Sequence, residues 1–194
     1  GADNNMWFVI PNTEVVGYIT PSGTYTTFDA VSDPDPSYSI GTIVTGGTID
    51  GDIWYIIAGG PTGPSSFDRL ARITPSGTIT TYDTLPDNIA TNSNFVKAPN
   101  DTMVFVNRIA GTLGRVDSSG TILYDNDITS RLPAGGGVLR LTAAPDNATV
   151  RMAYVDASYT DNGLLTYNVD GTYVSTLDLD DRTVTAMAYN AGGD

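Results

Sequence analysis

A short phrase that recurs four times along the chain constrains the fold more than any other feature. Each copy combines an apolar residue, small polar residues, a glycine and a threonine. The copies are Ile19–Tyr25, Ile73–Ile79, Val116–Ile122 and Tyr167–Tyr173, with their glycines at Gly23, Gly77, Gly120 and Gly171. The spacing of about 50 residues is typical of proteins built from a repeated supersecondary unit that cannot bury its apolar face alone. The sequence therefore predicts four copies of one unit.

Each repeat divides into short strands rich in β-branched and aromatic residues, and no useful window has a helical apolar period. In repeats two to four we expect strands at 40–45, 53–57, 70–74 and 78–82; at 95–98, 103–106, 113–116 and 121–124; and at 138–143, 150–155, 164–169 and 172–177. Glycine in the recurring phrase permits positive φ and closes a hairpin. Asp161-Asn162-Gly163 predicts a hairpin between the second and third strands of the fourth repeat.

Four antiparallel strands per repeat predict an all-β fold: a small β-propeller of about four four-stranded blades. We expect a single domain over residues 1–194, with repeats at about 1–36, 37–90, 91–134 and 135–182. A solenoid is the alternative, but its repeats are usually shorter and more uniform.

The two ends of the chain predict how the first blade is completed. The first repeat begins directly with its second strand, and the segment 183–194 contains an apolar strand without a repeat of its own. We therefore expect this C-terminal strand to complete the first blade, in cis or from a neighbouring subunit, which would remove exposed sheet edges. The residues of this predicted closure are Met6, Trp7, Phe8, Val9, Ile10, Val184, Ala186, Met187 and Tyr189.

Composition excludes several classes of function. The chain has 9 basic and 22 acidic residues, a net charge of −13 and no histidine. Such a surface repels phosphate backbones and anionic lipids, so we expect no nucleic-acid partner. No apolar run is long enough to span a bilayer, so we expect no membrane insertion. The absence of cysteine excludes a disulfide framework and thiolate metal sites.

No residue type in the chain favours catalysis. General acid–base chemistry at neutral pH favours histidine or a glutamate tuned by burial, and Glu14 is the single glutamate. We predict no catalytic residue, no metal ligand and no cofactor. The acidic groups at 33–35, 125–127 and 178–181 are interpreted as solvated turns, because none has the spacing of a cation-binding loop.

Several other side chains are interpreted as structural. Arg72 and Arg115 occupy matching positions, and we expect each to pack across its sheet and pair with a neighbouring aspartate. Aromatic residues on the expected second strands are interpreted as core: Trp7, Phe8, Trp54, Phe105 and Tyr154. Three tyrosines nearer loops or ends could contact a sugar or a protein: Tyr38, Tyr159 and Tyr189.

The blade phrases resemble those of streptogramin-lyase-like and NHL-type β-propellers. The resemblance rests on Ala71–Thr78, Leu113–Val116 and the turns Ala98–Asp101 and Ala144–Asn147. It implies the propeller fold. The lyase of that family works through histidine, which this chain lacks, and a lactonase-like metal site would need a central glutamate. The resemblance therefore implies no site residue here.

Three hypotheses about function follow. The first is a non-enzymatic structural or assembly subunit, such as an extracellular or cell-surface filament protein, whose partner is itself. The second is a soluble propeller that binds a carbohydrate or peptide, and the third is a lyase-like or metal-dependent enzyme. Two glycosylation sequons, at Asn100 and Asn147, would matter in an exported protein. The chain begins with Gly1 rather than methionine, so we expect a processed protein or an excised segment.

Overall fold

The structure is a computed structural model that describes residues 4–10, 13, 15–30, 39–44, 52–58, 69–82, 95–100, 102–107, 111–144, 148–158 and 162–179. These residues form strands, turns and one short 3₁₀ turn, η2 (Thr129–Arg131), which confirms the all-β prediction. No helix in this part of the chain could cross a lipid bilayer. The chain divides into two compact units, Gly1–Ser93 and Asn94–Asp194.

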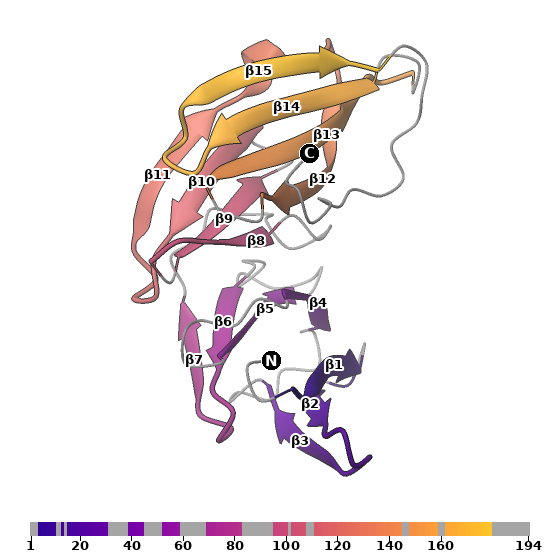
Figure 1. Cartoon of the computed structure of the whole chain (residues 1–194), viewed down its shortest axis with the longest axis vertical. Coiled ribbons are helices and arrows are strands. Elements are labelled where there is room, and N and C mark those ends of the chain that lie inside the picture. The colour runs from indigo at the N-terminus through magenta and orange to yellow at the C-terminus, as the bar shows by residue number, and fades with distance from the viewer. Residues whose placement is uncertain are drawn as a thin grey trace. The chain divides into compact units, whose positions relative to one another are not determined.

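The first unit contains two antiparallel meanders (Figure 1). We call them the first and second blades. The first blade has three strands in the order β1 (Met6–Ile10), β2 (Val15–Ile19) and β3 (Tyr25–Asp29). The second has four, in the order β4 (Ser39–Val44), β5 (Ile53–Ala58), β6 (Arg69–Ile73) and β7 (Ile79–Tyr82).

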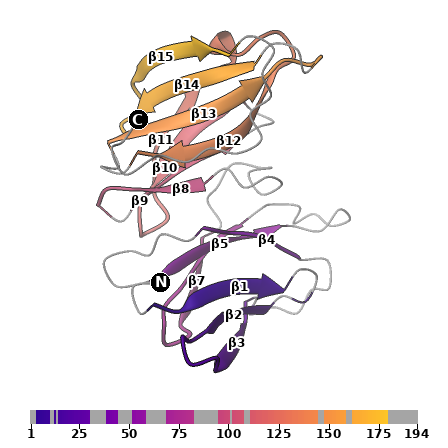
Figure 2. The ribbon, with the colours of Figure 1, turned by 45° about the vertical axis from the view of Figure 1, so that its right-hand side comes forward.

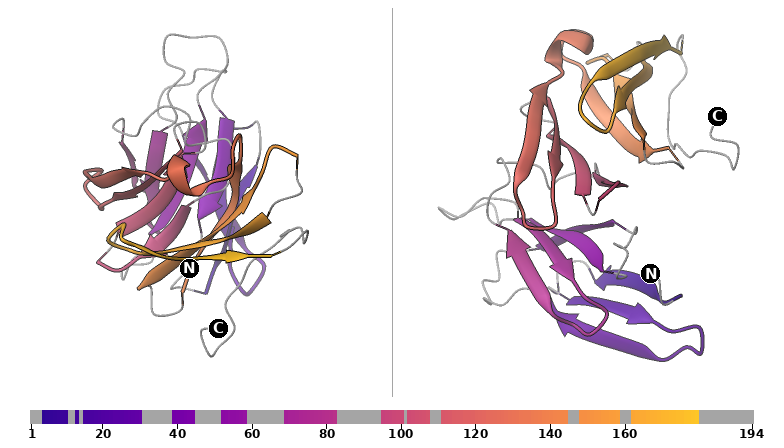
Figure 3. Two further views of the ribbon diagram at one scale, coloured as in Figure 1. Left: turned by 90° about the horizontal axis from the view of Figure 1, so that it is seen from above. Right: turned by 60° about the vertical axis from the view of Figure 1, so that its left-hand side comes forward.

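The second unit contains the third and fourth blades, each with four strands. The third blade consists of β8 (Phe95–Ala98), β9 (Thr102–Asn107), β10 (Thr112–Val116) and β11 (Ile122–Asp127). The fourth consists of β12 (Gly137–Ala143), β13 (Thr149–Val155), β14 (Asn162–Asn168) and β15 (Tyr173–Asp178). Figure 3 shows these two sheets stacked beside each other, and one apolar core fills the space between them.

Every strand expected from the sequence in repeats two to four is present, with ends that shift by up to three residues. The four blades also fall within the four predicted repeats. The predicted hairpin between the second and third strands of the fourth repeat is confirmed, because β13 and β14 pair antiparallel. Asn162 and Gly163 lie at the start of β14, where they pair with Val155 and Tyr154. Gly163 lies at this place because a β-carbon there would collide with the Tyr154 hydroxyl.

The recurring phrase forms the same tight turn in all four blades. In the second blade, Gly77 N–H donates to Thr74 O at 2.9 Å, and Thr74 N–H donates to Thr78 O at 2.9 Å. Gly77 has φ of 90°, and the matching glycines Gly23, Gly120 and Gly171 also have positive φ. The sequence prediction of a positive-φ glycine turn is therefore confirmed, because only glycine adopts this backbone without steric cost.

In every blade an aromatic residue on one strand pairs with a small residue on the next strand. Phe8 pairs with Gly17, Phe105 with Gly114 and Tyr154 with Gly163, while Ala71 takes the place of glycine opposite Tyr55. A β-carbon on Gly114 would overlap the Phe105 ring. The glycines thus leave space on the third, fourth and first blades for the rings of Phe105, Tyr154 and Phe8, which a β-carbon would occupy.

The predicted core aromatics are confirmed in the main. Trp7, Trp54, Phe105 and Tyr154 are buried, whereas Phe8 is half-buried. Residues 183–194, Tyr38, Tyr159 and Asn147 lie outside the described residues.

Candidate functional site

The outer edge of β1 is the first candidate site. In each of the other three blades the strand that corresponds to β1 pairs with a further strand on its outer side. These further strands are β4, β8 and β12. Among the described residues the first blade has no such strand, and β1 pairs with β2 alone (Figure 2). A sheet edge presents backbone N–H and C=O groups to which another strand can add.

The side chains of β1 alternate between two environments. Trp7 and Val9 face the apolar core that the first blade shares with the second. Met6 and Ile10 are exposed, and Phe8 is half-buried. The structure thus brings the five predicted N-terminal closure residues together on one edge strand. Val184, Ala186, Met187 and Tyr189 lie outside the described residues, so their predicted role in closure stays a prediction.

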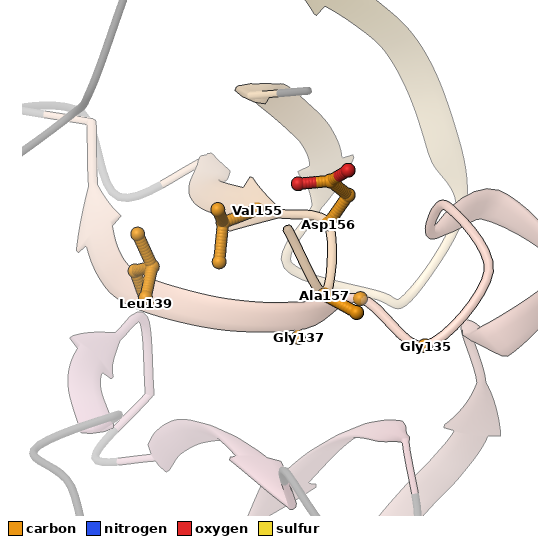
Figure 4. A pocket seen from close by; sticks show the side chains of 7 residues that line it. Gly135, Gly137, Leu139, Val155, Asp156 and Ala157 are labelled. Carbon is orange, nitrogen blue, oxygen red and sulfur yellow. The ribbon is translucent and has the colours of Figure 1, made fainter. Parts of the chain in front are cut away.

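A pocket at the start of the fourth blade is the second candidate site (Figure 4). It has a volume of about 330 Å³ and lies where Gly135 and Gly136 lead into β12, beside the end of β13. The side chains that line it are Leu139, Val155, Asp156 and Ala157. Gly136 must lack a side chain, because a β-carbon there would lie 2.7 Å from Val155 O. Sequence reasoning missed this pocket, since only the Gly135–Gly137 run marks it.

The aspartates of the described turns act as hydrogen-bond acceptors. Asp117 Oδ1 accepts from Ser119 Oγ at 2.6 Å and from Thr121 N at 2.9 Å, and these bonds, with Ser119 the largest cause, lower the pKa of Asp117 below its ordinary value of 3.8. Asp127 accepts from the Thr129 hydroxyl at 2.6 Å, which likewise lowers its pKa. No group of three potential metal ligands occurs in the described parts of the chain.

Buried tyrosines hold neighbouring segments in place as neutral donors. Tyr55 Oη donates to Ala30 O at 3.0 Å, and burial raises the pKa of Tyr55 well above 10. Tyr124 Oη donates to Val169 O at 2.9 Å, and burial raises the pKa of Tyr124 to about 12. Both tyrosines stay protonated at neutral pH, so their arrangement is structural.

The two matching arginines have structural contacts, as expected, and among the described residues Arg72 forms an ion pair with an aspartate. Arg72 Nε lies 3.2 Å from Asp52 Oδ2. Arg115 donates instead to the Thr102 hydroxyl at 2.7 Å, Pro99 O at 3.0 Å and Val169 O at 3.2 Å. Among the described residues Thr102 has the place beside Arg115 that Asp52 has beside Arg72, so an aspartate partner of Arg115 stays a prediction.

The sequon at Asn100 lies in the turn between β8 and β9. Asn100 is exposed and has φ of 59°, while Thr102 of the same sequon is buried. Its hydroxyl donates to Pro99 O at 2.7 Å and accepts from Arg115. Thr102 therefore has a structural role that is independent of glycosylation.

No protein-family model and no curated protein matches the sequence. Among solved structures, the chain is similar to a streptogramin B lyase, with 17% identity, a TM-score of 0.64, and coverage of 94% of this chain and 53% of that one. A catalytically inactive histidine-to-alanine variant of virginiamycin B lyase from Staphylococcus aureus, solved with quinupristin, matches with 21% identity, a TM-score of 0.63 and coverage of 94% and 54%. An oligogalacturonate lyase in complex with manganese matches with 13% identity, a TM-score of 0.59 and coverage of 96% and 56%.

These similarities show that the chain has the β-propeller fold, and its four sheets are blades of that fold. They bear out the predicted resemblance to streptogramin-lyase-like propellers at the level of the fold. The chain spans about half the length of each of these structures.

Proposed function

We propose that this chain is a non-enzymatic structural subunit that assembles by strand addition at the edge of β1. The observation that carries the proposal is that the first blade has three strands among the described residues, whereas the other three blades have four. The donor is the C-terminal segment 183–194, from the same chain or from a neighbouring copy. In the second case repeated addition builds an extracellular or cell-surface filament.

The composition of both partners supports this pairing. β1 has the sequence Met-Trp-Phe-Val-Ile. The donor has Val184 and Ala186 at alternate positions, and Tyr189 follows three residues after Ala186. Residues at alternate positions in a strand share a face, so one edge can fix the register of the other. A net charge of −13 with a single lysine favours solubility of an exported subunit before it assembles.

The lack of histidine makes a lyase-like enzyme the weaker proposal. The inactive variant of virginiamycin B lyase differs by replacement of a histidine, and this chain has no histidine. The described aspartates and tyrosines of the turns and core have structural partners instead of a shared cleft. We therefore propose that no lyase-like activity is present.

Removing and restoring the donor strand tests the proposal. The full chain and a variant ending at residue 182 are compared by light scattering and electron microscopy. We expect the full chain to form larger species and the shortened variant to lose them. A peptide of residues 183–194 added in trans should raise the melting temperature of the shortened variant saturably, because a ligand of the folded state stabilises it by mass action. A scrambled peptide of the same composition is the control.

The shortened variant could assemble as well as the full chain and fail to respond to the peptide. That result would show that strand addition at β1 is wrong.

The pocket at the start of β12 favours a second candidate function, the binding of a small polar ligand. Its volume of about 330 Å³ is within the range of small-molecule sites, and Asp156 is the one charged side chain among the described residues that line it. Calorimetric titration with simple sugars and short peptides tests it. Ala157→Trp, which fills the pocket, should abolish any binding, whereas Leu123→Ala on the exposed surface should not.

A further inference from the structure

Glycines shape one wall of the pocket at the start of the fourth blade. Gly135 has φ of 69°, a left-handed conformation that favours glycine. A β-carbon on Gly136 would lie 2.7 Å from Val155 O and 2.8 Å from Pro133 O, so no side chain fits there. Gly136 N–H donates to Pro133 O at 2.8 Å, which fixes the turn ahead of β12. This wall of the pocket is therefore backbone without side chains.

A β-bulge in β12 places an apolar side chain in the same pocket. The pairing of β12 with β13 shifts between Val138 and Arg140, which leaves Leu139 out of the ladder. A bulge bends its strand and changes the direction of a side chain, and bulges are common beside functional sites. Leu139 lines the pocket together with Val155 and Ala157, so three apolar side chains contribute to its surface.

Asp156 is a charged residue at a place where no other blade has one. It follows Tyr154 by two residues, as Ile57 follows Tyr55, and the two tyrosines have the same place in their ladders. Ile57 is 1% exposed, and the matching residue of the third blade is the uncharged Asn107. The blade structure therefore does not require a carboxylate at this position, and we looked to the pocket for its role.

The surroundings of this carboxylate favour a positively charged ligand. In Figure 4 the Asp156 carboxylate and the side chains of Leu139 and Val155 lie on one side of the β12 ribbon. Among the described residues that line the pocket, none carries a positive charge. The net charge of −13 attracts cations to the chain and repels anions. Charge-assisted hydrogen bonds from an ammonium group to a carboxylate are about twice as strong as neutral ones.

We propose that this pocket binds a small aliphatic amine as its ammonium ion. The ammonium group donates to the Asp156 carboxylate, and the alkyl chain lies against Leu139, Val155 and Ala157, which removes apolar surface from water. The proposal rests on the second candidate function above and names the chemical class of its ligand. It does not depend on strand addition at the edge of β1.

An NMR titration of the unmodified chain with three probes of equal chain length tests the proposal. The probes are n-butylammonium chloride, 1-butanol and sodium butyrate at constant ionic strength. We expect butylammonium to shift the amide signals of Gly135, Gly136 and Ala157 saturably. Butanol should bind about tenfold more weakly, because it forms no charge-assisted hydrogen bond, and butyrate should not bind. Equal binding of butanol, or binding of butyrate, would overturn the proposal.

Matched substitutions separate the pocket from the general negative charge of the chain. Asp156→Asn should weaken butylammonium binding about tenfold or more, because it removes the charged acceptor. Asp125→Asn, at an exposed aspartate of β11, removes the same charge and should leave the binding unchanged. Equal weakening by the two variants would show general surface attraction and overturn the proposal. The three probes on the unmodified chain decide the matter if Asp156→Asn does not fold.

The simple sugars of the earlier titration separate failure of this proposal from failure of the pocket as a binding site. Shifts of the same amide signals with a sugar but not with butylammonium would overturn the amine ligand and leave the pocket a binding site. The absence of shifts with every probe would overturn both. Strand addition at β1 is judged by the shortened chain in either case.

Discussion

The first and second blades carry the same pattern of residues but differ in what covers it. In the second blade the cross-strand pair of Ile53 and Ile73 and the ring of Tyr55 are buried against the first blade. In the first blade the matching pair of Met6 and Ile19 is exposed, and the ring of Phe8 is only half-buried. The difference shows that a blade's face is apolar because the repeat requires it, while its burial depends on having a neighbour.

The largest expected effect is a difference in unfolding free energy between removing the ring of Tyr55 and removing the ring of Phe8. Tyr55→Ala should cost about 3–5 kcal/mol of unfolding free energy, because it removes a fully buried aromatic side chain. Phe8→Ala should cost about 1–2 kcal/mol, in proportion to its partial burial. Urea unfolding followed by tryptophan fluorescence measures both costs.

The comparison of the two blades fails if the two substitutions cost the same, because the burial of the two rings would then make no difference to stability.

A smaller contrast separates the turns of the same two blades. Gly23→Ala should cost about 1 kcal/mol, because alanine is strained at positive φ. Gly77→Ala should cost about 1–3 kcal/mol more, since its methyl group also collides with the Phe28 ring. Thermal unfolding measured by circular dichroism gives both values. Equal costs would show that Phe28 moves aside freely and does not close the contact between the first and second blades.

The smallest effect concerns acid sensitivity of the third-blade turn. The pKa of Asp117 is lowered, so its contribution to stability is present above its ordinary pKa of 3.8 and is lost as the pH falls through the folded-state value. In the second blade the uncharged Thr74 hydroxyl accepts the matching bond from Thr78 N at 3.0 Å. Asp117→Thr should therefore change neutral-pH stability by less than about 0.5 kcal/mol.

Melting temperatures between pH 5 and pH 2 check this prediction. The fall in melting temperature on acidification should be smaller for Asp117→Thr than for the unmodified chain. An unchanged pH profile would mean that the Asp117 bonds do not persist in solution.

The sequence sufficed for the local features of the fold and for part of the site. Alternating apolar residues between glycine turns predicted the strands, and the missing first strand of the first repeat marked β1 as an edge. Asn162-Gly163 correctly marked the hairpin between β13 and β14, but the sequence did not show that Gly163 belongs to β14, where the Tyr154 hydroxyl leaves no room for a side chain. The pocket beside Asp156 was not predicted, because its wall comes from two strand ends that the sequence does not place together.

The sequence by itself determined the repeat, the turn at each positive-φ glycine and the apolar character of both blade faces, because all three depend on residues close together along the chain. Only the tertiary structure decided which faces are covered. Burial of Ile53 and exposure of Met6 follow from the presence or absence of a packed neighbour, although both residues satisfy the same local pattern. Packing is a relation between distant segments, so the open face of the first blade became visible only in three dimensions.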